Sequence, residues 1–110
     1  MNVLINLTPH DIHVKEGETI TTYPATGDVA RVTVQNEQVG IVNGAPIIRP
    51  VYGKVEGLPA YQKQGMYYIV SMLVRSAMPE RKDLLSPDSG PTAKRDDRGQ
   101  IEYVCGWLSN

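Results

Sequence analysis

The stretch MYYIVSMLVRSAMP, residues 66–79, decides the fold, because its hydrophobic pattern changes part of the way along. It begins with MYYIV, a continuous apolar run rich in β-branched and aromatic side chains. Such a run is typical of a strand that is buried on both faces. Residues 71–78 instead place apolar side chains at helical spacing, and Pro79 follows as a helix terminator. The stretch therefore predicts a buried strand followed directly by a short helix.

The half of the chain before this stretch alternates between apolar and polar residues. Residues 3–7 (VLINL) and 11–16 (DIHVKE) read as strands, and Gly17 begins a turn into TITTY. The runs ARVTVQNEQVGIV, residues 30–42, and APIIRPVYGKVEG, residues 45–57, are interrupted by Gly, Asn or Pro, as in short antiparallel strands. The predicted turn residues between these strands are Gly40, Gly44, Gly53 and Gly57.

The end of the chain, IEYVCGWL at residues 101–108, is predicted to form one last strand. The apolar neighbours of Cys105 in this run indicate a buried and inert thiol. We expect a single domain over residues 1–110, of the α+β or mainly β class. It should contain about five to seven short, mostly antiparallel strands, in a sheet or a partly open barrel, with one short helix near 71–78.

Composition narrows the classes of function. The 110 residues carry a net charge of -1 at pH 7, so no basic field favours nucleic acid or an anionic membrane. The single cysteine cannot form an intramolecular disulfide, which favours a reducing compartment. There is no secretory signal pattern and no run of about 18 apolar residues. We therefore expect a soluble cytoplasmic protein.

A polar segment follows the predicted helix. In RKDLLSPDSGPTAKRDDRGQ, residues 81–100, the two leucines should anchor the start, and residues 86–98 should form a polar loop of mixed charge. Acids and bases nearly cancel, yet guanidinium, hydroxyl and glycine N–H groups suit a phosphate or a carboxylate. The candidate residues for binding a ligand or a partner are Ser71, Arg75, Arg81, Lys82, Ser86, Lys94, Arg95 and Arg98.

Two other sets of residues have alternative interpretations. Ser71, between strand and helix, suits an anion contact or a nucleophile, although an N-cap explains it fully. His10 and His13 are weak metal candidates with Asp11, because residues three apart on a strand point to opposite faces. The tyrosines at 61, 67 and 68 could stack on a nucleotide, although core packing explains 67 or 68. We expect no metal or other cofactor.

No enzyme signature is present in the sequence. Neither a phosphate-binding glycine motif nor the Gly-x-Ser-x-Gly elbow of hydrolases occurs.

Several motifs occur together along the chain: NLTPH at 6–10, ARV at 30–32, YGKVEGLP at 52–59, YIVS at 68–71, RKDLL at 81–85 and RGQ at 98–100. In this combination, and over almost the whole chain, the sequence resembles a group of small uncharacterised proteins of tailed phages and prophages. Members of the group often have a second proline soon after the LP, and a compact Pro-Gly loop where this chain has SPDSGPTAKRDD. The resemblance implies an accessory protein made inside an infected bacterium.

Three hypotheses for the function follow. The first is a non-enzymatic accessory protein of the host cytoplasm that binds a host protein, including one of host defence, through residues 81–98. The second is a binder that sequesters a nucleotide or another phosphorylated small molecule between Ser71 and the arginines. The third, ranked last, is a small hydrolase that uses Ser71 or the histidines. Exposed strand edges also leave homo-oligomerisation open.

Overall fold

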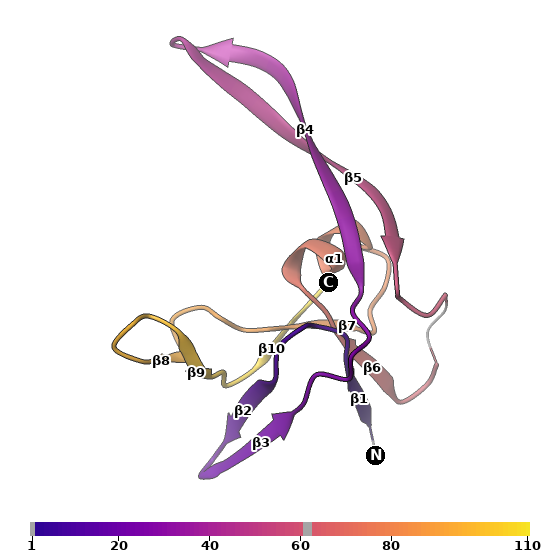
Figure 1. Ribbon diagram of the computed structural model, residues 1–110, viewed down its shortest axis with the longest axis vertical. Coiled ribbons are helices and arrows are strands. Elements are labelled where there is room, and N and C mark those ends of the chain that lie inside the picture. Colours follow the sequence, from indigo (N-terminus) through magenta and orange to yellow (C-terminus); the bar gives the residue numbers. More distant parts are fainter. Residues whose placement is uncertain (1, 61–62) are drawn as a thin grey trace.

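The computed structural model describes residues 2–60 and 63–110, and its strands and helix are shown in Figure 1. In chain order they are β1 (Val3–Asn6), β2 (Ile12–Glu16), β3 (Thr19–Tyr23), β4 (Arg31–Val42), β5 (Ala45–Glu56), β6 (Met66–Ile69), α1 (Met72–Ala77), β7 (Leu84–Pro87), β8 (Lys94–Arg95), β9 (Ile101–Tyr103) and β10 (Trp107–Ser109). This confirms the predicted class, a small β-rich domain with one short helix. The described strands outnumber the expected five to seven because several are only two or three residues long.

Strand β6 lies inside the main sheet, whose order is β1-β6-β7-β10. It pairs in parallel with both β1 and β7, while β10 pairs with β7 in the antiparallel direction. Tyr68 and Ile69 point to opposite faces of the sheet as neighbours on a strand, and both are buried. The apolar run is therefore buried on both faces, as its composition predicts.

Helix α1 follows β6 with only Val70 and Ser71 between them. The Ser71 Oγ accepts a hydrogen bond of 3.2 Å from the Val74 N–H, which caps the helix. Val74 is buried in the core cluster, and Pro79 follows the C-cap residue. The predicted helix, its cap and its end are confirmed.

A buried ion pair fixes the turn after the helix. The Arg81 Nε and Nη2 donate to the two carboxylate oxygens of Asp83 at 2.8 and 2.7 Å, and Nη1 donates to the Pro59 carbonyl at 2.9 Å. The Asp83 side chain is 0% exposed. Hydrogen bonding to Asp83 raises the pKa of Arg81, although burial opposes this shift. Arg81 is therefore bound up in the fold and buried, and its role as a binding residue stays a prediction.

The residues after this pair form strands where a loop was expected. Leu84 is buried, which confirms the anchor at the start of the segment. Within the predicted loop at 86–98, however, the first two residues belong to β7 and Lys94–Arg95 form β8. Their backbone groups find hydrogen-bonding partners in β10 and β9, so the polar segment is held at both ends.

Strands β4 and β5 form a long antiparallel hairpin, which we call the arm. Each strand has 12 residues, and Asn43 (φ 50°) and Gly44 (φ 82°) form the turn with the left-handed backbone that such hairpins need. The short strands predicted here are therefore wrong. Gly40 and Gly53 lie inside the arm beside its register shifts, and were wrongly predicted as turn residues.

Figure 1 shows the arm projecting from the rest of the molecule. The radius of gyration, 16.2 Å, exceeds the roughly 13 Å expected of a compact chain of this length.

The last predicted strand is also wrong, because the chain bends within it. Residues 101–103 form β9 and residues 107–109 form β10, which belong to different sheets. Cys105 lies at the bend and is exposed, with its Sγ donating to the Thr92 carbonyl at 3.5 Å. The buried thiol expected from its apolar neighbours is therefore corrected.

Replacing Arg81 should destabilise the fold strongly. Arg81→Met leaves the buried Asp83 carboxylate without its partner, so the free energy of unfolding in urea should fall by about 3–5 kcal/mol. The exposed neighbour Lys82 provides the control, because Lys82→Met should change the free energy of unfolding by no more than about 0.5 kcal/mol. A loss below about 1 kcal/mol for Arg81→Met contradicts a structural role for the ion pair.

Candidate functional site

A concave feature lies between β2 and β9. Val104, which directly follows β9, forms a parallel bridge with Val14 of β2. The Lys15 N–H donates to the Val104 carbonyl at 2.8 Å, and the Val104 N–H donates to the His13 carbonyl at 2.9 Å. Before this bridge a groove of about 640 Å³ opens between residues 10–13 and residues 99–104. Its volume lies within the usual range of ligand sites.

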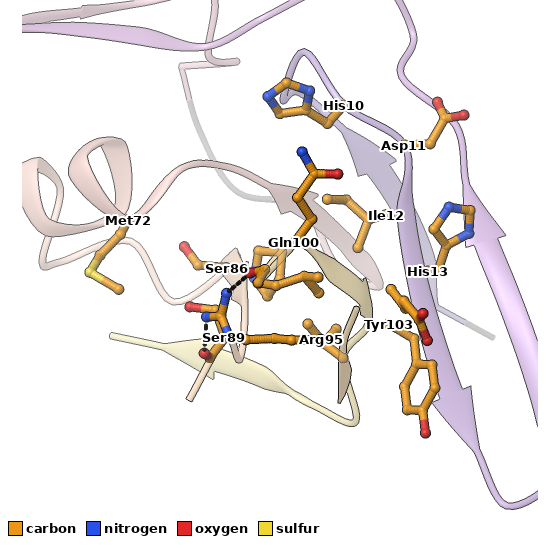
Figure 2. Close-up of a pocket in the computed structure, with 15 residues that line it drawn as sticks. His10, Asp11, Ile12, His13, Met72, Ser86, Ser89, Arg95, Gln100 and Tyr103 are labelled. Atoms are coloured by element: carbon orange, nitrogen blue, oxygen red, sulfur yellow. Dashed lines mark hydrogen bonds between the residues drawn. The ribbon is translucent and has the colours of Figure 1, made fainter. Parts of the chain in front are cut away.

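Residues from other elements complete the wall of the groove. Met72 of α1, the segment from Ser86 to Ser89 and Arg95 of β8 all contribute to its lining (Figure 2). The groove thus combines parts of the chain that are far apart in sequence. Its lining mixes apolar side chains such as Ile12 with polar ones such as Gln100.

Arg95 spans the turn of the β8–β9 hairpin. Its Nη1 donates to the Gly99 carbonyl at 2.8 Å and its Nη2 to the Ser89 carbonyl at 3.1 Å. The side chain remains exposed, and a guanidinium has further N–H donors besides these two. Arg95 is therefore the predicted binding residue that the structure places best for contact with a ligand.

The two histidines both line the groove but do not converge. The His13 Nδ1 lies 2.8 Å from the Thr22 Oγ1, and Asp11 accepts a hydrogen bond from the Ala25 N–H at 2.9 Å. Figure 2 shows the side chains of His10, Asp11 and His13 well separated. Within residues 2–60 and 63–110, no group of three or more His, Cys, Asp or Glu side chains is placed to hold a metal.

Ser86 and Arg75 are bonded to each other and to the main chain. Ser86 is buried, and its Oγ donates to the Val70 carbonyl at 2.9 Å and accepts from the Arg75 Nε at 3.1 Å. The Arg75 Nη1 donates to the Ser109 carbonyl at 3.1 Å. These two predicted binding residues therefore fasten the C-terminal strand to the helix.

The other predicted residues lie apart from one another. Ser71 caps the helix and lines a separate hollow at the base of the arm, together with Leu73 and Arg31. Lys82, Lys94 and Arg98 are exposed and do not line the groove.

The predicted stacking on tyrosines also finds little support. Tyr68 is buried in the core, Tyr67 beside it in β6 is half-buried, and Tyr61 lies outside the described residues.

Sequence reasoning missed most of the groove. Residues 101–104 gave no functional signal, because they were assigned to a plain terminal strand. Their role in the groove depends on β9 lying beside β2, and no local pattern indicates that contact.

The chain matches no known protein family, no curated protein and no solved structure. In the described part of the chain, no helix has the length and the hydrophobicity needed to cross a membrane.

The cap at Ser71 makes a quantitative prediction. Ser71→Ala removes the acceptor of the Val74 N–H, so it should lower the free energy of unfolding by about 1 kcal/mol. Ser76→Ala, at an exposed position inside the same helix, should not destabilise, because alanine has the higher helix propensity. Equal effects of the two substitutions in urea denaturation contradict the capping role.

Proposed function

We propose that this protein is a non-enzymatic binding protein that takes up part of a partner protein in the β2–β9 groove. The groove itself carries the proposal, because it is large enough to receive side chains and is lined from five parts of the chain. The bridge between Val14 and Val104 holds its closed end in place. A partner can therefore dock without remodelling the sheet.

The chemistry of the lining suits a protein segment. Met72 and Ile101 are 52% and 42% exposed, so the groove offers apolar contacts that a partner can bury. Arg95 adds charge-assisted hydrogen bonds at the side. An apolar centre with polar groups around it is the usual composition of a protein interface.

The hydrogen bonds of the Ser71 and Ser86 hydroxyl groups favour a binding protein over a hydrolase. The Ser71 oxygen is taken up by the helix cap, and the Ser86 oxygen by Val70 and Arg75. A serine nucleophile needs a base within hydrogen-bonding distance, and neither hydroxyl has a histidine among these partners.

The resemblance to phage and prophage proteins supplies the biological setting of the proposal. In this setting the protein acts in the cytoplasm of an infected bacterium. Its partner is a host protein, and the candidate partners include factors of host defence. This setting rests on the motifs alone.

The experiment compares capture of a host protein by groove variants. The partner is identified by pull-down from infected cells, and its Kd for the purified protein is then measured. Ile101→Asp and Arg95→Glu should each weaken binding by about tenfold or more, since both change the groove lining. Arg95→Glu also removes the hydrogen bonds from Arg95 to Gly99 and Ser89. Ile101→Asp leaves Arg95 in place, so it tests the groove lining without that change.

Arg98→Glu is the matched control for charge. This residue is exposed and outside the groove, so the variant should bind as the wild type does. Unchanged affinity in both groove variants, with unchanged melting temperatures, contradicts the proposal.

A second candidate function is sequestration of a phosphorylated small molecule in the same groove. Arg95 and His10 both line it, and a guanidinium recognises phosphate well. A nucleotide or cyclic dinucleotide at 100 times its Kd should stabilise the protein by about 2.7 kcal/mol in a thermal-shift assay. The shift should disappear in Arg95→Gln and persist in Arg98→Gln. Absence of any shift across the nucleotides removes this candidate and leaves the protein partner.

A further inference from the structure

The outer half of the arm carries no charged residue. Residues 38–48, QVGIVNGAPII, include no Asp, Glu, Lys or Arg, and nearly all of them are exposed. Ile41, Val42 and Ile48 are 66%, 56% and 46% exposed. A projecting segment of this composition is a strong indication of an interaction surface, because soluble monomers rarely expose contiguous apolar patches.

Between residues 34 and 52, the register of the hairpin places the charged side chains on one face of the arm only. Directly opposite residues lie on the same face, and positions two apart on a strand share that face. One face, which we call the apolar arm face, contains the pairs Val34–Tyr52, Asn36–Pro50, Gln38–Ile48 and Ile41–Pro46. The other face carries the ion pair between Glu37 and Arg49, whose charged atoms lie 3.3 Å apart, and also the exposed Val42, Ile47 and Val51. Both faces therefore expose apolar side chains, and only the apolar arm face is free of charge.

Little in the described chain covers the apolar arm face. Val34, near the base, is half-buried, whereas Ile41, Ile48 and Tyr52 are exposed. Figure 1 shows the outer arm extending beyond the helix and the other strands. An isolated two-stranded hairpin is at best marginally stable in water, so burying this face would stabilise the arm.

We propose that the apolar arm face packs against the same face of a second copy, around a two-fold axis. In such a contact the residues near the axis meet their own copies, so charged side chains there would repel each other. The apolar arm face has no charged residue. Its two amides, Asn36 and Gln38, are each donor and acceptor, so either can hydrogen-bond to its own copy. A two-fold contact also leaves the ion pair of Glu37 and Arg49 in water.

The prolines favour a face contact over addition of a strand to the edge of β5. Pro46 and Pro50 have no N–H, and proline in a strand occupies a position that points away from the paired neighbour. The outer edge of β5 therefore lacks two donors that an added strand would need.

Insertion into lipid is disfavoured for a related reason. The open edges of a two-stranded hairpin present unpaired backbone groups, each of which costs several kcal/mol in hydrocarbon.

The dimensions predict a reversible dimer. The apolar arm face runs from Val34 to Ile41 on β4, a length of roughly 25 Å, and two strands cover a width of roughly 10 Å. Two facing arms therefore bury on the order of 500 Å² in total, which is less than a stable interface needs and corresponds to a weak, transient contact. The dimer should dissociate on dilution, and the grooves lie on other elements and stay open to a partner.

The test is sedimentation velocity over micromolar to millimolar concentrations. The wild type should show a concentration-dependent monomer–dimer equilibrium. Ile48→Glu places a charge on the apolar arm face and should weaken dimerisation by about tenfold or more. Ile47→Glu adds the same charge to the opposite face of the same strand, at a residue that is also exposed, and should dimerise as the wild type does.

Each other result overturns the proposal. A wild type that stays monomeric throughout excludes a second copy as the occupant. Equal loss in Ile47→Glu and Ile48→Glu, with unchanged circular dichroism, excludes the assigned face. If the wild type is a monomer that binds vesicles of neutral or anionic phospholipid and Ile48→Glu abolishes this binding, the occupant of the apolar arm face is lipid. If it is a monomer and Ile48→Glu loses the host partner, the occupant is another protein. Neither Ile47 nor Ile48 lines the groove, so these results are independent of the groove experiment.

Discussion

The buried pair of Arg81 and Asp83 is the interaction on which the rest of the structure depends. It fixes the turn between α1 and β7, and the Asp83 carbonyl accepts the Tyr68 N–H at 2.9 Å, which aligns the start of β7 with β6. Once β7 is placed, Ser86 lies beneath Val70 and receives Arg75, which in turn holds the C-terminal strand. Desolvating two charges is costly, so the pair specifies a unique arrangement more than it adds net stability.

Three of the six arginines link separate segments of this fold. Arg75, Arg81 and Arg95 each bond to backbone carbonyls, and each joins segments that a small core would hold weakly. A domain of 110 residues buries a limited apolar area, and part of this chain is spent on an arm outside the core. Hydrogen bonds from these guanidinium groups therefore hold segments together in addition to apolar packing. Only Arg95 combines such a role with a place in the groove.

The groove and the arm divide two kinds of contact between separate elements. The groove is built from β2, β9 and their neighbours, whereas the apolar arm face belongs to β4 and β5, which project away from them (Figure 1). In our proposals the arms join two copies and each groove remains available to a partner. The weak contact through the arms then strengthens binding in the grooves. A dimer presents two grooves and so gains avidity for a repeated or dimeric partner.

The sequence by itself determined the local elements. The apolar run of β6, the Ser71 cap, the Pro79 stop and the β2–β3 hairpin were all predictable, because each depends on neighbouring residues. The Asn43-Gly44 turn was equally local, and reading it as a hairpin signal would have revealed the arm. Only the tertiary structure decided the partner of Arg81, the exposure of Cys105, the split of the last strand and the existence of the groove. Each of these depends on which distant segments pair, and a polar or apolar residue looks the same in the sequence whichever neighbour it meets.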